Sequence, residues 1–306
     1  MVGSNNNIFS GDIYDWESWG KIYHSIEIWE PLVHFILEKE HLPISEVENL
    51  SPGTNAVFKS GSHVVKIFCP KESGLDGSVD YKTELFALSF VRFHGVSVPK
   101  LIAFGDVHDK YDFSYMIMDY IDGVDFIGAS ANFNDEEKFA FGKRLRDITD
   151  LMNKPCEDFN GIDVKKRHER WNKFSQSFKS ERLEYLKSHD FGEKVFIHGD
   201  LCEDNFIIDS NGRIYIIDFA DAVMAPICYE HAHIASQLFN FDKSYLRGYF
   251  GDYKTDELVD ICFDGILLHD FGESIIKDYI AEPQQIKINF LKDVRNGLYE
   301  LIKQIK

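Results

Sequence analysis

The sequence has 306 residues, with 33 Lys plus Arg against 51 Asp plus Glu, so its formal net charge is −18. This length suits two lobes, and a hydrophobic content of 44% predicts a sizeable core. The acidic balance argues against a nucleic-acid partner, which would need clustered cations. The first residues do not show the cationic stretch followed by an apolar stretch that is typical of a signal peptide, and the cysteines form no C-x-x-C pair, so we expect a cytoplasmic protein. No apolar run approaches the length of about 20 residues that a membrane-spanning helix needs, so we expect no membrane partner.

The predicted elements change in character along the chain. In the first part they are a helix over 29–40 with Pro31 in its first turn, strands over 46–50, 56–59 and 63–69, a helix over 79–93, and strands over 100–106 and 114–119. After Asp122-Gly123 they are helices over 135–153 and 168–188, a β region over 195–217, and further helices. The order predicts a β-rich first part and a mainly helical second part.

The most informative segment is HGDLCEDNFIIDSNGRIYIID, which begins at His198. Asn211-Gly212 is a preferred pair for a two-residue type I′ hairpin turn, because both residues tolerate positive φ. In such a hairpin the numbers of paired residues have a constant sum, here 423. Asn205 and Asp218 are therefore predicted to face each other where the hairpin opens.

An amide oxygen opposite a carboxylate forms half of a Mg²⁺ site, since this ion prefers oxygen ligands and takes water and phosphate as the others. Asp200 enters the same hairpin and can reach the same point, where it could accept the proton of a substrate hydroxyl. Polar residues at strand ends also occur as ordinary turn chemistry. Three of them in matching positions favour the catalytic interpretation.

A second pattern joins a lysine and a glutamate. Strand alternation places Lys66 on one face with Val64 and Phe68, while Glu84 interrupts the apolar stripe of the next helix. A buried charge is costly unless it is paired, so we expect Lys66 and Glu84 to form an ion pair. The alternative for Lys66 alone is a solvated strand edge.

Ahead of this strand lies the segment Ser51-Pro-Gly-Thr-Asn-Ala-Val. One glycine among small polar residues lets backbone N–H groups approach a phosphate. Gly53, Thr54 and Asn55 are therefore candidate nucleotide-binding residues, although the segment is not a Walker-type loop.

Together these segments resemble the aminoglycoside phosphotransferase and choline-kinase-like family of small-molecule kinases. HGDLCEDN is similar to that family's catalytic loop, IIDFADA to its metal-binding segment and MIMDYIDGV to its inter-lobe hinge. The resemblance implies an α+β, bilobal, protein-kinase-like fold, in which a small N-terminal lobe holds an antiparallel sheet. The implied domains are an N-terminal lobe over 1–118, a hinge over 119–123 and a larger, mainly helical lobe over 124–306.

The resemblance also implies roles for individual residues. Asp200 would be the catalytic base, Asn205 and Asp218 the Mg²⁺ ligands, and Lys66 the phosphate contact that Glu84 positions. The backbones of Asp119 and Ile121 would meet the adenine of ATP or the base of GTP. His198 would support the loop.

The implied acceptor is a hydroxyl of a small, cationic molecule such as an aminoglycoside, and the enzyme would then confer antibiotic resistance. Glu230, Asp270 and Glu273 are the candidate substrate-binding acids, with Asp264 beside them in the sequence. The alternatives are a kinase of choline, a sugar or homoserine, a catalytically silent nucleotide-binding protein, and a metal hydrolase using His198 and Asp200. The first 45 residues, with Trp16, Trp19 and Trp29, either pack on the N-terminal lobe or offer a partner site.

Overall fold

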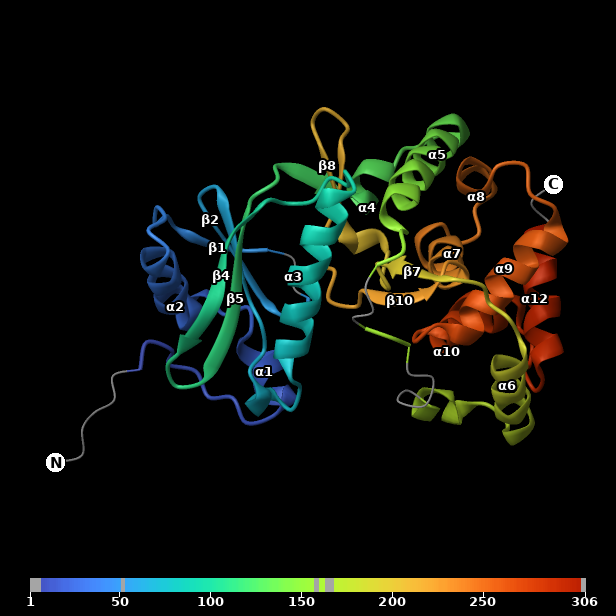
Figure 1. The fold of residues 1–306 in the computed structure, drawn as a ribbon, viewed down its shortest axis with the longest axis horizontal. Helices are drawn as coiled ribbons and strands as arrows, with labels where there is room; N and C mark the ends of the chain where they lie inside the picture. The colour runs from blue at the N-terminus through green and yellow to red at the C-terminus, as the bar shows by residue number, and fades with distance from the viewer. Residues whose placement is uncertain (1–6, 51–52, 157–159, 163–167, 304–306) are drawn as a thin grey trace. The chain divides into compact units, whose positions relative to one another are not determined.

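The computed structural model describes residues 7–50, 53–156, 160–162 and 168–303. The chain divides into two compact units (Figure 1). The first comprises Met1–Phe90 and Ser97–Gly123, and the second comprises Val91–Val96 and Val124–Lys306.

The first unit is built on an antiparallel five-stranded sheet with strand order β1-β2-β3-β5-β4. Its elements are α1 (Trp16–Ile22), α2 (Ile26–Lys39), β1 (Val47–Asn49), β2 (Ala56–Ser60), β3 (His63–Ile67), the 3₁₀ turn η1 (Lys71–Ser73), α3 (Gly77–Phe93), β4 (Leu101–His108) and β5 (Asp112–Asp119). The tight β2–β3 connection is possible because Gly61 takes a positive φ of 61°.

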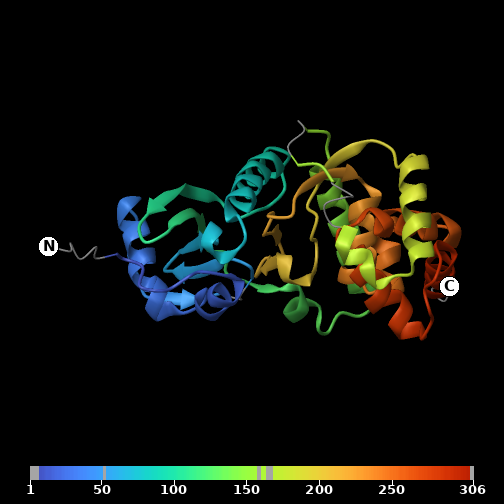
Figure 2. The same ribbon diagram turned by 90° about the horizontal axis from the view of Figure 1, so that it is seen from below.

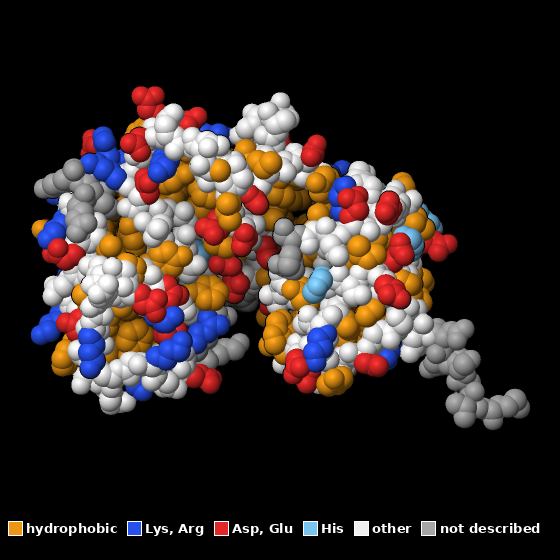
Figure 3. Space-filling model, turned by 180° about the vertical axis from the view of Figure 1, so that it is seen from behind, with side chains coloured by type: hydrophobic (Ala, Val, Ile, Leu, Met, Phe, Trp, Pro, Cys, Tyr) orange, Lys and Arg blue, Asp and Glu red, His pale blue; other side chains and the backbone are white. Residues whose placement is uncertain are grey.

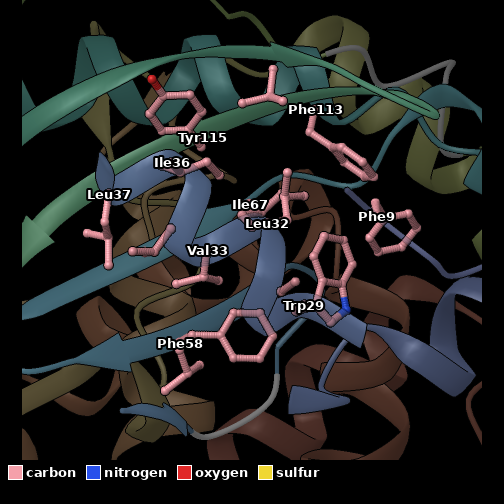
Figure 4. Close-up of a cluster of buried hydrophobic side chains, with 14 of the residues drawn as sticks. Phe9, Trp29, Leu32, Val33, Ile36, Leu37, Phe58, Ile67, Phe113 and Tyr115 are labelled. Atoms are coloured by element: carbon pink, nitrogen blue, oxygen red, sulfur yellow. The ribbon is translucent and has the colours of Figure 1, made fainter. Parts of the chain in front are cut away.

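The two faces of this sheet are covered by different parts of the chain. Val65 and Ile67 of β3 point into a core that includes Trp29 of α2 (Figure 4). Lys66, between them, points to the other face, toward α3. Figure 1 accordingly shows α2 and α3 on opposite sides of the strands.

The N-terminal tryptophans are mostly core residues. Trp19 and Trp29 are buried, and their rings pack edge to face with centroids 5.6 Å apart. Trp16 is 47% exposed. The N-terminal segment therefore packs on the sheet, as the first of the two alternatives predicted, because the sheet face above Val65 and Ile67 would otherwise be open to water.

Two predicted helices differ in the structure. Helix α2 begins at Ile26 rather than at 29, so Pro31 lies inside the helix, on its exposed side. Burial of the opposite face, including Trp29, offsets the missing hydrogen bond. The predicted helix over 168–188 is interrupted, because the Ser175 hydroxyl caps a new helix by accepting from the Phe178 N–H at 3.1 Å.

The remaining elements form two small sheets and a group of helices. They are β6 (Gly123–Asp125), α4 (Phe126–Ser130), α5 (Asp135–Met152), η2 (His168–Lys173), α6 (Gln176–Ser188), β7 (Lys194–Ile197), η3 (Glu203–Asn205), β8 (Phe206–Asp209), β9 (Ile214–Ile216), β10 (Val223–Pro226), α7 (Cys228–His233), the π-helix η4 (Ile234–Leu238), α8 (Lys243–Phe250), α9 (Thr255–Leu268), α10 (Gly272–Ile275), the π-helix η5 (Ile276–Ala281), α11 (Glu282–Gln284) and α12 (Leu291–Lys303). The sheets are β6-β8-β9 and β10-β7.

Helix α9 packs against both α7 and α12, and both ribbon views show α9 and α12 side by side (Figures 1 and 2). At Gly265 of α9 an added Cβ would lie 1.9 Å from the carbonyl oxygen of Cys228, so only glycine permits this approach to α7. The fold is thus the predicted α+β type, with an antiparallel sheet first and a mainly helical part second. None of the helices in the described part of the chain is long and apolar enough to span a membrane.

Candidate active site

The ion pair predicted in the first unit is present. Lys66 Nζ lies 2.6 Å from Glu84 Oε2, and the two residues are 5% and 2% exposed. The centroid of the Phe68 ring lies 5.4 Å from the ammonium nitrogen. The pair joins β3 to α3 and holds the lysine in one direction.

The loop before β2 is fixed from two sides. Thr54 offers its carbonyl oxygen to the Trp19 indole N–H at 2.9 Å, and the Asn55 side chain accepts from the Cys69 N–H at 3.3 Å. Asn55 is buried, whereas Gly53 and Thr54 are exposed. The Asn55 side chain therefore shapes the loop, and Gly53 and Thr54 are the residues that a ligand could reach. Positions 51 and 52 lie outside the described residues.

The end of β5 is held by backbone hydrogen bonds. Asp119 donates its N–H to the carbonyl oxygen of Lys100 at 3.0 Å, and Tyr120 donates to that of Ser62 at 2.8 Å. The Asp119 carboxylate also accepts from the Lys100 N–H. These bonds fix the path of the chain into Ile121.

The hairpin register differs by one residue from the prediction. Phe206 pairs with Ile216, and the Ile217 N–H donates to the Asn205 carbonyl oxygen, so paired numbers sum to 422 rather than 423. Asn205 is therefore not directly opposite Asp218. The reason is local: Asp209 Oδ1 accepts from the N–H groups of two turn residues, and this selects a three-residue loop with Gly212 at φ 74°.

Asp218 still lies near Asp200, but for a reason other than strand pairing. Strand β9 ends at Ile216, and Asp218 has a positive φ of 60°, which turns the chain out of the strand direction. The charges of Asp218 and Asp200 interact, and both act on His198. A non-glycine residue in this conformation is held there by its surroundings.

The loop after β7 is rigidly organised around Asp200. Asn205 donates its side-chain N–H to the Asp200 carbonyl oxygen at 2.7 Å, and the Asp200 N–H donates to His198 Nδ1 at 3.2 Å. Gly199 has φ 89°, and a Cβ there would lie 2.1 Å from the Asp221 carbonyl oxygen. The loop thus touches the segment that follows Asp218, and only glycine allows this contact.

His198 is a structural residue. It is fully buried, Nδ1 accepts from Asp200, and Nε2 lies 3.0 Å from the Ile217 carbonyl oxygen, to which it donates. Burial keeps the pKa of His198 below its usual value. Because both ring nitrogens are in use, His198 cannot serve as the metal ligand that the hydrolase alternative requires.

One residue of this site was missed by sequence reasoning. His233 Nε2, at the end of α7, lies 3.2 Å from Asp200 Oδ1. Burial alone would raise the pKa of Asp200, but His233, aided by His198, outweighs it and holds that pKa below the usual value. The sequence signal was a pair of histidines, His231 and His233, that follow Glu230 in the short helix α7, with His233 33 residues beyond Asp200.

Glu230 corrects the prediction of a substrate-binding acid. It is 1% exposed, and its Oε2 accepts from the His198 N–H at 2.8 Å and from the Asn153 side chain at 3.4 Å. Burial raises its pKa to about 8. Glu230 therefore supports the loop around Asp200 from within the protein and is not positioned to meet a ligand.

The other acids of the prediction differ among themselves. Glu273 is buried, with Lys173 Nζ at 3.0 Å. Asp264 accepts from the Tyr185 hydroxyl at 2.6 Å and contacts His189 at 3.0 Å. Asp270 is half-buried. Groups of the protein thus already engage the Glu273 and Asp264 carboxylates, and the charge of Asp270 acts on the buried Arg182.

The residues present fit a magnesium ion. The Asn205 amide turns its nitrogen to Asp200, so its oxygen faces the other way, and the Asp218 carboxylate lies near the same loop. No group of three or more His, Cys, Asp or Glu residues forms a metal cage in the described ranges. One carboxylate and one amide oxygen suit Mg²⁺, which commonly completes its shell with water and phosphate.

Comparison with known proteins places this arrangement in a family. The sequence pattern of the phosphotransferase enzyme family matches residues 58–259, which include Lys66, Glu84 and the loop around Asp200. The chain belongs to this family. It is a small-molecule phosphotransferase, as predicted from the motifs. A search among curated proteins found no match.

Solved structures show the same fold. The GDP complex of aminoglycoside 2′-phosphotransferase-IIIa aligns with a TM-score of 0.59 at 18% identity, covering 90% of this chain and 97% of that one. The choline kinase LicA from Streptococcus pneumoniae aligns with a TM-score of 0.56 at 20% identity, covering 89% of this chain and 98% of that one. Spectinomycin phosphotransferase, in complex with ADP and spectinomycin, aligns with a TM-score of 0.56 at 14% identity, covering 90% of this chain and 98% of that one.

Proposed function

We propose that this phosphotransferase moves the γ-phosphate of ATP or GTP to a hydroxyl of a small cationic molecule, an aminoglycoside or a similar amino sugar, with Mg²⁺ as cofactor. One observation carries the proposal. Asp200, Asn205 and Asp218 lie together around one rigid loop, while the buried Lys66–Glu84 pair is intact. These two groups of residues support the proposal, because phosphoryl transfer uses a lysine on the phosphates together with a base and metal ligands.

Each residue has a distinct role in the proposed reaction. Lys66, oriented by Glu84, contacts the α- and β-phosphates, and the backbone of Gly53 and Thr54 approaches the phosphates. The backbone groups of Asp119 and Ile121 meet the base within a hinge over 119–123. Asn205 and Asp218 hold Mg²⁺, which when bound would neutralise phosphate charge. Asp200 orients the acceptor hydroxyl and takes its proton as the acceptor oxygen bonds to the γ-phosphorus, while the bond from that phosphorus to the β-phosphate oxygen breaks and ADP or GDP leaves.

The ionisation of Asp200 supports its role as the base. His233 and His198 keep its pKa below the usual value despite burial, so the carboxylate is charged at neutral pH. Cys202, two residues away, has its pKa raised to about 12 by burial and then by Asp200, so it stays a neutral thiol. The loop therefore presents Asp200 as its proton acceptor.

Charge supports a cationic acceptor. The net charge is −18, and Asp and Glu side chains are visible across the face in Figure 3. Glu203 and Asp204 are exposed acids within the catalytic loop, and Asp270 is a third candidate contact. Choline is the second candidate acceptor, because solved choline kinases share the fold and choline is also cationic.

The decisive test is nucleotide consumption with Mg²⁺ against panels of aminoglycosides and of cationic metabolites. We expect turnover with an amino sugar, and Asp200→Asn should lower kcat by about 10³-fold, because the general base is lost. Nucleotide affinity, measured by calorimetry, should stay within about twofold, since Asp200 does not hold the nucleotide.

Three outcomes would change the proposal. Turnover with choline alone would replace the amino sugar as acceptor. Unchanged kcat in Asp200→Asn would remove Asp200 from the mechanism. Nucleotide binding without turnover on either panel would favour a silent nucleotide-binding protein.

A further inference from the structure

His233 is a buried titratable group beside Asp200 that the proposed mechanism uses only for its effect on the charge of Asp200. It is 1% exposed, and its Nε2 lies 3.2 Å from Asp200 Oδ1, whereas the Asp200 side chain is 31% exposed. The histidine thus touches the carboxylate from the protein side, and solvent or substrate reaches the carboxylate from the other. We propose that His233 is a positioning residue for Asp200, whose Nε2–H fixes Oδ1 and thereby directs Oδ2 to the acceptor hydroxyl.

The orientation of the His233 ring is set by stacking. It lies parallel to the His269 ring, with centroids 4.7 Å apart and planes at 13°. His269 in turn stacks on Tyr229 at 3.9 Å, and its Nδ1 accepts from the Phe271 N–H at 3.0 Å. This column of rings restricts rotation of His233, so its Nε2 stays aimed at Asp200.

The polarity of the contact assigns the proton. A lone pair on Nε2 would face a carboxylate oxygen and repel it, so Nε2 must carry hydrogen. Among the residues that the structure describes, neither ring nitrogen of His233 makes an aligned hydrogen bond, and the polar contact of the ring is that of Nε2 with Asp200 Oδ1 at 3.2 Å. Asp200 is therefore the partner for which this ring is oriented.

The contact has the distance of a hydrogen bond but not its alignment. Nε2 and Oδ1 are 3.2 Å apart, and catalytic hydrogen bonds are often poorly aligned until the substrate complex forms. The hydrogen-bonding pattern of the helix changes directly after His233, where α7 ends and the π-helix η4 begins at Ile234. Such bulges are frequent at functional sites, where they redirect a side chain.

The inference rests on the proposed function, and kinetics test it with three variants. His233→Phe keeps the ring but removes the donor, so kcat should fall about 10- to 100-fold while KM for both substrates stays within about twofold. His233→Gln places a donor near the Nε2 position and should recover most of kcat. His231→Phe is the matched control: it lies on the same helix, is also buried, and meets Tyr249 and Phe250 instead.

A pH profile separates positioning from packing. Loss of the donor destabilises the charged carboxylate, so the acid limb of kcat/KM should move to higher pH in His233→Phe and not in His231→Phe. The other groups that act on Asp200, His198 and Asp218, are kept in every variant. An unmoved acid limb, or a His233→Gln variant as impaired as His233→Phe, would overturn the inference.

A measurement without turnover keeps the inference separate from the proposed function. In ¹⁵N NMR of the wild-type protein, the His233 ring, assigned by its loss in His233→Gln, should be protonated at Nε2. A neutral ring protonated at Nδ1 alone would overturn the inference, whatever the enzyme phosphorylates. Absence of phosphate transfer in the wild type would instead count against the proposed function. If His233→Phe does not fold, His233→Asn replaces it, because its amide nitrogen takes the Nδ1 place.

Discussion

At the residue scale, Lys66 and Glu84 show how two residues together predict a buried ion pair. A lysine on a strand can be solvated or buried, but a glutamate within the apolar stripe of the next helix favours a buried lysine that pairs with it. The structure brings the two charges to 2.6 Å. Both were found from the sequence because burial of either charge requires the other.

We predict that Lys66→Met destabilises the protein by about 3–5 kcal/mol, since the Glu84 carboxylate stays buried without the ammonium group. The double variant Lys66→Met/Glu84→Leu should recover much of this loss, because no charge stays buried. Urea denaturation measures both. The control is Lys21→Met, because Lys21 pairs with Glu17 at 2.7 Å on the exposed surface. This variant should show no measurable change in the free energy of unfolding. A double variant no more stable than Lys66→Met would contradict the explanation.

Glu230 makes a pH-dependent contribution to stability. Its folded-state pKa is raised to about 8 by burial, above its usual value, so the folded state binds the proton more tightly. Its contribution is present in full below the unfolded pKa of about 4.3 and is lost as pH rises through about 8.

We therefore predict that Glu230→Gln removes part of the fall in Tm between about pH 5 and pH 8, because the amide has no charge to bury. Thermal unfolding across this range measures the effect. Parallel curves for wild type and variant would show that Glu230 does not titrate there.

At the scale of elements, the β8–β9 hairpin shows that an Asn-Gly dipeptide predicts a turn but does not determine which strand residues pair. Asn211-Gly212 is present in the turn, yet the Asp209 side chain organises a three-residue loop and moves every pair by one. Asp218 reaches Asp200 through its positive φ rather than through pairing. The side chain of one turn residue thus outweighed the preference of the dipeptide.

Two glycines in the catalytic segment provide a matched prediction. Gly199 and Gly212 both have positive φ, but a Cβ at Gly199 meets the Asp221 backbone at 2.1 Å, whereas one at Gly212 meets nothing within 4 Å. Gly212→Ala should cost about 1–2 kcal/mol of unfolding free energy. Gly199→Ala should cost at least about 3 kcal/mol and abolish turnover, because the loop backbone must also move. Equal costs would show that the contact with Asp221 is unimportant.

At the scale of the whole molecule, net charge is the property with a measurable consequence. A charge of −18 attracts cations over distances that salt shortens. For an amino-sugar acceptor, KM should therefore rise about fivefold between about 50 mM and about 500 mM KCl. The KM for a neutral sugar acceptor, or a kcat at saturation, should change much less. A salt-independent KM for the amino sugar would limit electrostatics to direct contacts.

The sequence by itself determined the family-level motifs, the α+β order of elements, the Lys66–Glu84 pair and the loop around Asp200, because these depend on local spacing, periodicity and the cost of burying charge. Tertiary structure alone decided the rest. Glu230 and His233 lie on one short helix, and only its packing beneath the catalytic loop shows that one supports His198 and the other touches Asp200. Spacing along a chain carries no information on which distant side chains meet, and that is set by how helices and loops pack.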